Sequence, residues 1–159
     1  VIGGRSELDE AAGAMLAAVL EKRGLRAEAL PPETLSAGHI TTLAGTEARA
    51  ICLSYLGLGT GPAHIRYLVR RLRRILPGGV TILVCYWDEE EDTAGVEALL
   101  ELVDADAYAT TLGEAVDILI AAAKGEFTEG AAEKGARKEA ASQVPAKKAK
   151  AKKAPASAA

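Results

Sequence analysis

The feature that most constrains this chain is the alternation of short apolar runs with longer segments of helical periodicity. Residues 50–56 and 80–87 are almost wholly apolar, which is typical of strands covered on both faces. Between them, residues 62–76 place apolar side chains every three to four positions, as in a helix with one buried face. Strands that alternate with helices favour a parallel sheet with right-handed crossovers, so the chain is predicted to be an α/β protein.

The complete pattern predicts five strand–helix units. Strands are expected at residues 1–2, 26–30, 50–56, 80–87 and 106–109. Helices are expected from Ser6 to Gly24, at 37–43, from Pro62 to about 76, over 96–103 and after Thr111. The buried face of the first helix is expected to carry Leu8, Ala12, Met15, Leu16, Val19 and Leu20. Five such units favour a flavodoxin-like, doubly wound five-stranded parallel sheet of order 2-1-3-4-5.

Charge divides the chain into a domain, residues 1–124, and a tail, residues 125–159. The first part carries 11 basic and 18 acidic side chains, whereas the second carries 8 basic and 4 acidic ones. The tail is rich in alanine and lysine, and we expect it to be disordered because it has little to bury. Only two residues precede Gly3, which is too few for a strand, so the first strand is expected to be truncated beside a missing N-terminal neighbour.

Glycine-rich loops follow the first and third predicted strands, where the strand order reverses and such sheets bind ligands. Both loops lead into helix N-termini, whose free amides favour anions. The candidate crevice residues are Gly3, Gly4, Arg5, Ser6, Ser54, Tyr55, Gly57, Gly59, Thr60 and Tyr86. Alternatively, the glycines only form tight turns, because neither loop matches a complete dinucleotide or phosphate-loop pattern.

No catalytic or metal-binding set is visible in the sequence. A phosphorelay receiver needs an aspartate at the end of the third strand, where residues 53–55 read Leu-Ser-Tyr. Nucleophilic hydrolysis at Ser54 needs a base, yet the two histidines are His39 and His64, which we interpret as surface residues. The acidic run 88–92 is interpreted as a solvated turn rather than a metal site. We therefore expect no enzymatic activity, no metal and no cofactor.

Arginines crowd the predicted helix that begins at Pro62, on the side opposite its apolar stripe. They are Arg66, Arg70, Arg71, Arg73 and Arg74. We expect Arg66, Arg70, Arg73 and Arg74 to contact anionic lipid or another protein, or else to form a solvated face that pairs with the acids of the domain. The lysine-rich tail suits weak polyanion binding, but nucleic acid is not expected to be the main partner. Cys52 and Cys85 lie in apolar runs and are interpreted as reduced core residues of a cytosolic protein.

Two family resemblances bear on function. Residues 3–4 (Gly-Gly), 16–24 and 31–33 (Pro-Pro-Glu), with Ser54-x-Leu56, resemble cobalamin-binding domains. The resemblance implies their topology without their cofactor, because residues 7–12 lack the cobalt-ligating histidine. In addition, Tyr86 and Trp87 stand where that family has glycines, so their rings are expected to fill the cofactor slot.

Residues 3–12, 19–25, 52–56 and 62–74 resemble a C-terminal extension of some bacterial permeases of the autoinducer-2 exporter family. This resemblance implies a non-enzymatic regulatory or sensor domain on the cytoplasmic side of the inner membrane, attached to an N-terminal membrane domain. No apolar run in the present sequence approaches the roughly 20 residues of a membrane helix. The alternatives are a small-molecule module that binds a nucleotide or corrinoid through the glycine loops, and an enzyme completed by a missing domain.

Overall fold

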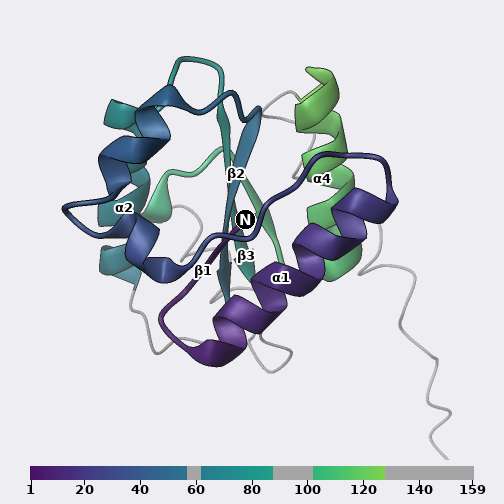
Figure 1. The fold of residues 1–159 in the computed structure, drawn as a ribbon, viewed down its shortest axis with the longest axis horizontal. Helices are drawn as coiled ribbons and strands as arrows, with labels where there is room; N and C mark the ends of the chain where they lie inside the picture. Colours follow the sequence, from purple (N-terminus) through teal and green to yellow (C-terminus); the bar gives the residue numbers. More distant parts are fainter. Residues whose placement is uncertain (57–61, 88–101, 128–159) are drawn as a thin grey trace, which may run out of the picture.

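The computed structural model describes residues 1–56, 62–87 and 102–127, which form layers of helices around a parallel sheet (Figure 1). The sheet has four strands: β1 (Ile2–Gly3), β2 (Ala50–Tyr55), β3 (Thr81–Tyr86) and β4 (Ala107–Ala109). They lie in the order β1-β2-β3-β4, and every neighbouring pair is parallel. The prediction of an α/β protein with a parallel sheet is confirmed.

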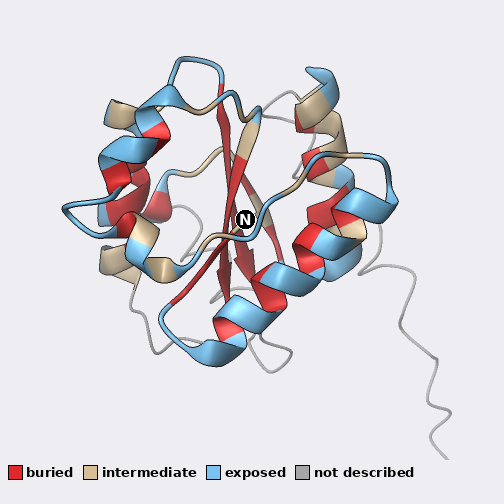
Figure 2. Ribbon diagram, in the orientation of Figure 1, coloured by how far each residue is buried: buried red, intermediate tan, exposed pale blue. Residues whose placement is uncertain are grey.

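Helices cover both faces of the sheet, as Figure 1 shows. Helices α1 (Glu7–Lys22) and α4 (Leu112–Lys124) lie on one face, while α2 (Pro62–Ile75) lies on the other. The 3-10 helices η1 (Pro32–Leu35) and η2 (Ile40–Gly45) accompany α2. Figure 2 shows the buried residues on the strands and on the inward sides of the helices, so the sheet separates two hydrophobic clusters.

The pleat of β2 explains why its sequence is apolar without alternation. Ile51, Leu53 and Tyr55 belong to the cluster on the α2 side, whereas Cys52 belongs to the cluster on the α1 and α4 side. Because successive side chains of a strand point to opposite faces, a strand covered on both faces needs apolar residues at every position. Ser54 is the one polar residue of this strand and is fully buried.

The predicted helix ends are confirmed where capping residues stand in the sequence. Helix α1 begins with a capping box between Ser6 and Asp9, and α4 begins with the same motif between Thr111 and Glu114. Helix α1 ends before Gly24, whose φ of 85° lies in the left-handed region that glycine adopts without strain.

The predicted buried face of α1 is partly wrong. Leu8 and Met15 are 69% and 62% exposed, whereas Asp9 and Gly13 are buried beside the correctly predicted Leu16. Two contacts set this rotation of the helix. The Asp9 carboxylate accepts a hydrogen bond from the end of β2, and Gly13 lies against Val1 and Gly3.

Two predicted elements differ in the structure. Residues 26–30 form no full strand but a single parallel bridge between Leu30 and Ile2, so the described sheet has four strands rather than five. The predicted helix at 37–43 is replaced by the 3-10 helix η2, where Ser36 bonds His39 instead of capping an α-helix. The predictions for 88–101 and for the tail from residue 128 onward lie outside the described residues. Phe127, just before that point, packs against the cluster on the α1 and α4 side.

Candidate functional site

The predicted crevice lies at the carboxyl edge of β1 and β2, and its central group is the Asp9 carboxylate. Asp9 stands in the first turn of α1, where the capping box and the positive end of the helix favour a negative charge. One carboxylate oxygen accepts from the Ser6 N–H at 2.9 Å, and the other accepts from the Leu56 N–H at 2.6 Å. Asp9 therefore ties the start of α1 to the end of β2. From the sequence, Asp9 can be recognised only as the partner of Ser6 in a helix-capping pair, because its bond to Leu56 joins segments 47 residues apart.

Gly3 and Gly4 are explained by the close approach of α1. A Cβ added to Gly3 would lie 2.7 Å from the Glu10 Cα, in the helix backbone. A Cβ on Gly4 would lie 2.5 Å from the Asp9 carboxylate and 2.6 Å from the Tyr55 ring. In the described structure, the space that these glycines leave open is filled by the protein itself rather than left for a ligand.

Ser54 and the two aromatic rings at the end of β3 do not form one cavity wall. The Trp87 indole N–H donates to the Ser54 hydroxyl at 2.8 Å, on the sheet face that carries α1 and α4. Tyr86 belongs to the cluster on the α2 side, beside Tyr55, its partner in the register of the two strands. The two rings thus lie on opposite faces of the sheet. The Ser54 hydroxyl, which a ligand in the crevice would need, already accepts a hydrogen bond from Trp87.

The remaining polar groups at this edge form a mixed electrostatic environment. Burial, followed by the nearby Asp9 carboxylate, raises the pKa of the Tyr55 hydroxyl far above its ordinary value, so this group stays protonated. Partial burial and the positive charge of Arg5 lower the pKa of His64, which lies in the first turn of α2. Gly57, Gly59 and Thr60 lie outside the described residues. The structure therefore brings Gly3, Gly4, Ser6 and Tyr55 close to Asp9, while the Ser54 carbonyl accepts from the Gly4 N–H.

The predicted basic surface is present on α2. Arg70, Arg73 and Arg74 are exposed, and Arg66 is half-buried. Arg73 pairs with the Asp106 carboxylate, which is the single ion pair found among the described residues. Arg71 turns toward the backbone carbonyls of residues 35 and 36.

A small pocket of about 260 Å³ opens beside these arginines. Its lining is Pro62, Ala63, Arg66, Tyr67, Arg70 and Leu102. Tyr67 and Leu102 are among the most exposed large apolar side chains of the described chain, at 59% and 52%. This surface of α2 thus combines guanidinium groups with exposed apolar side chains.

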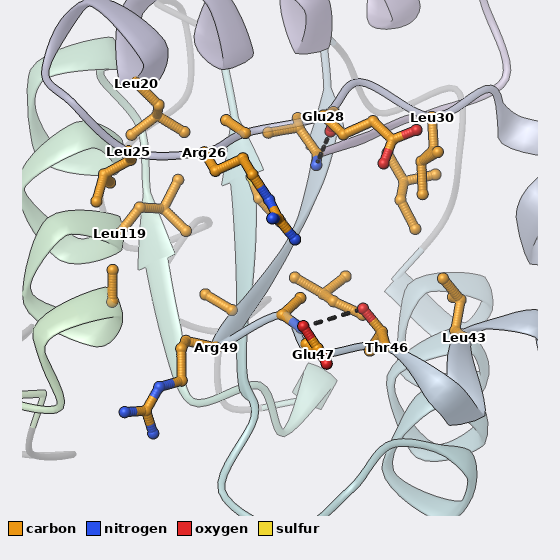
Figure 3. Close-up of a pocket in the computed structure, with 18 residues that line it drawn as sticks. Leu20, Leu25, Arg26, Glu28, Leu30, Leu43, Thr46, Glu47, Arg49 and Leu119 are labelled. Atoms are coloured by element: carbon orange, nitrogen blue, oxygen red, sulfur yellow. Dashed lines mark hydrogen bonds between the residues drawn. The ribbon is translucent and has the colours of Figure 1, made fainter.

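A larger cavity, about 950 Å³, lies at the opposite, amino edge of the sheet (Figure 3). One wall is formed by residues 25–28 and Leu30 and the other by residues 46–52. The N-terminus lies between them, since Val1 bonds Glu28 and Ile2 pairs with Leu53. The only sequence signal for this cavity was the shortness of the first predicted strand. None of the predicted crevice residues lines it.

Cys52 and Cys85 are both free and buried, with their sulfur atoms 3.2 Å apart, and burial raises the pKa of the Cys85 thiol. Within residues 1–56, 62–87 and 102–127, no group of three or more histidine, cysteine or acidic side chains is arranged to hold a metal ion. No helix in these ranges is long and apolar enough to cross a bilayer.

Comparisons of this chain with protein-family models, with curated proteins and with solved structures found no match.

Proposed function

We propose that this chain is a non-enzymatic regulatory or sensor domain of a bacterial inner-membrane transporter, of the autoinducer-2 exporter type that its sequence resembles. In this proposal the domain lies on the cytoplasmic side and α2 faces anionic lipid headgroups. The observation that carries the membrane contact is the α2 surface, where Arg66 and Arg70 share a pocket with the exposed Tyr67 and Leu102.

The charges on this surface suit a lipid headgroup better than a purely solvated role. The carboxylate of Asp106 pairs with Arg73, while no described carboxylate lies within ion-pair distance of Arg66, Arg70 or Arg74. Near an anionic leaflet, each such cation adds on the order of 1 kcal/mol of binding free energy. Tyrosine and leucine side chains beside the cations suit the boundary between headgroups and acyl chains.

The arrangement at the carboxyl edge supports a role without catalysis. Asp9 is engaged by two backbone N–H groups and Ser54 by the Trp87 indole, so neither is placed as a free base or nucleophile. We also propose that the sheet follows the flavodoxin-like order 2-1-3-4-5. The bridge between Leu30 and Ile2 supports this order, because it puts residues 26–30 beside β1 on the side away from β2.

Vesicle flotation tests the membrane contact. We expect the 159-residue chain to float with vesicles containing phosphatidylglycerol at low salt, and not with pure phosphatidylcholine vesicles. The double variant Arg70→Glu/Arg74→Glu should lose most of this binding. The control, Lys22→Glu/Arg23→Glu, makes the same charge change at the exposed end of α1 and should bind nearly as the unaltered chain does.

Both double variants keep the lysine-rich tail, so its contribution to vesicle binding is equal in the comparison. Equal losses in the two variants would show a nonspecific charge effect and would contradict the role of α2.

The transporter assignment has a separate test. An antibody against this chain should detect, in cells that express it, a membrane polypeptide that resists carbonate extraction and is much larger than 16.5 kDa. A soluble band would contradict it.

A further inference from the structure

The cavity at the amino edge has the layout of an empty position in the sheet. Ile2 pairs with Leu53 of β2 on one side and forms a parallel bridge with Leu30 on the other. Beyond Val1, both neighbouring segments continue as the two walls of the cavity (Figure 3). In this register, four residues added before Val1 would lie opposite residues 25–28 of one wall and residues 48–51 of the other.

We infer that this cavity accepts an extended apolar peptide segment, joined to Val1 through a peptide bond and running parallel to β2. Such a segment extends β1 backward between its two neighbours and completes a fifth strand at residues 26–30. The site is distinct from the α2 surface, so this inference does not depend on the proposed membrane contact.

Hydrogen bonds at the cavity already follow the ladder of a parallel strand pair. The Leu30 N–H donates to the Val1 carbonyl at 2.8 Å, and the Val1 ammonium donates to the Glu28 carbonyl at 2.7 Å. These are successive rungs between β1 and residues 28–30. The ladder thus reaches the Val1 nitrogen, the first atom of the chain, and its next rungs would lie in the cavity.

Backbone groups on both walls are directed toward the empty position. Gly4 donates to the Ser54 carbonyl, and alternate residues of a strand direct their backbone to the same neighbour. Ala50, four residues before Ser54, therefore faces the cavity with both its N–H and its C=O group. Cys52 faces it with its N–H only, because the register of Ile2 with Leu53 directs the Cys52 C=O to the Ile2 N–H. By the same rule, the Glu28 N–H faces the cavity from the other wall, and among the described residues no acceptor bonds it. An added strand would bond these groups.

The side chains around the cavity also match a buried strand rather than a polar ligand. Leu20, Leu25 and Leu119 line it on the α1 and α4 side of the sheet, and Leu43 and Ile51 line it on the other. A segment with apolar residues at all positions fits between them, as in the interior of a parallel sheet.

The charged side chains of the lining are exposed to solvent. They belong to Arg26, Glu28, Glu47 and Arg49. A site for a small polar molecule instead needs a few polar groups that converge within the pocket. Burial also lowers the pKa of the Val1 amine, because the ammonium sits at the mouth of this apolar space. A peptide bond at that nitrogen removes the charge and keeps an N–H for Glu28.

The test compares N-terminal extensions on the full chain. One version carries four apolar, β-branched residues before Val1, and the control carries Gly-Ser-Gly-Ser. We expect the apolar extension to raise Tm by several degrees and to slow amide exchange at Glu28 and Cys52 about tenfold or more, with little effect from the control. Equal behaviour of the two extensions would overturn the inference, and so would a rise in Tm without protection of these amides.

Proline substitutions on one wall provide a second, independent comparison. Glu28→Pro removes an N–H that faces the cavity, whereas Ala29→Pro removes one that faces outward from the same segment. The gain in Tm from the apolar extension should shrink in Glu28→Pro and persist in Ala29→Pro. Because each gain is measured against the same variant without the extension, any general cost of proline cancels. Equal gains in both variants would show that the segment does not pair with this wall.

Discussion

Asp9 is predicted to contribute to stability mainly through its bond to β2 rather than through its own helix. Asp9→Ala removes the acceptor of the Leu56 N–H, 2.6 Å away, and of the Ser6 N–H, 2.9 Å away. It also removes an acidic group from the first turn of α1, where the helix dipole favours it. The Leu56 N–H is part-buried, so its loss of a partner is not fully repaired by water.

The expected loss in the free energy of unfolding is the sum of two contributions, one from helix capping within α1 and one from the bond to Leu56 in the tertiary structure. Losing a helix-capping interaction costs about 1 kcal/mol of the free energy of unfolding. A hydrogen bond from a backbone N–H to a carboxylate contributes about 1.5–3 kcal/mol. Asp9→Ala should therefore cost about 2.5–4 kcal/mol, which corresponds to a fall in Tm of roughly 10 °C.

The second capping box of the chain provides a matched control. Glu114 occupies the same position in α4 as Asp9 does in α1, but among the described residues its carboxylate accepts hydrogen bonds only from Thr110 and Thr111. Glu114→Ala should therefore cost only about 1 kcal/mol. Asp9→Asn and Glu114→Gln test the charge while preserving size. An asparagine can accept one of the two N–H groups but turns its own NH₂ toward the other.

Urea unfolding followed by circular dichroism measures each cost, and fluorescence of the single tryptophan, Trp87, gives a second probe. Coincident transitions by the two probes support a two-state comparison. If Asp9→Ala costs no more than Glu114→Ala, then the bond to Leu56 contributes nothing to stability and does not fix the rotation of α1.

Three further predictions concern the carboxyl edge and the N-terminus. Gly3→Ala should lower the free energy of unfolding by about 1–3 kcal/mol, because the added Cβ would meet the α1 backbone. Gly113→Ala, whose Cβ would meet no atom within 4 Å, should raise the free energy of unfolding by about 0.5–1 kcal/mol. Changes of the same sign in the two variants would contradict this prediction. Ser54→Ala should leave the Trp87 indole N–H without its acceptor. This change should shift the fluorescence emission of Trp87 and lower the free energy of unfolding, measured in urea, by about 1–3 kcal/mol. An unchanged emission spectrum would argue against the hydrogen bond. Burial lowers the pKa of the Val1 amine below its ordinary 8.0, so the unfolded chain holds that proton more tightly than the folded chain does. The free energy of unfolding should therefore rise with pH up to about 8. Acetylation of Val1 should abolish this rise, and an equal rise after acetylation would contradict the prediction.

The elements that could be predicted from the sequence are those whose signals are local. Strand β2, helix α2 and the ends of α1 and α4 follow from apolar runs, helical periodicity and capping residues within a few positions of each other. Their tertiary environment agrees with these signals. Residues 62–76, for example, are predicted to form a helix with one buried face, and α2 buries Ile65, Leu68, Val69 and Leu72.

Where the prediction failed, a contact distant in sequence decided the outcome. Leu8 and Met15 suit a buried helix face by periodicity, but the bond of Asp9 to β2 turns them toward solvent. Residues 26–30 have the composition of a strand, but a strand needs a neighbour along its length. Here Ile2 reaches only Leu30, and Val1 reaches only Glu28 and Leu30.

The sequence by itself determined the α/β class, the parallel sheet and the basic surface of α2, because these depend on the order and spacing of residue types. Only the tertiary structure decided what the glycines do. Gly3 and Gly4, which could equally have opened a ligand crevice, are packed against α1, and the open space lies instead at the other edge of the sheet. Whether a glycine leaves room for a ligand or for a helix depends on the segment that packs beside it, which no local pattern records.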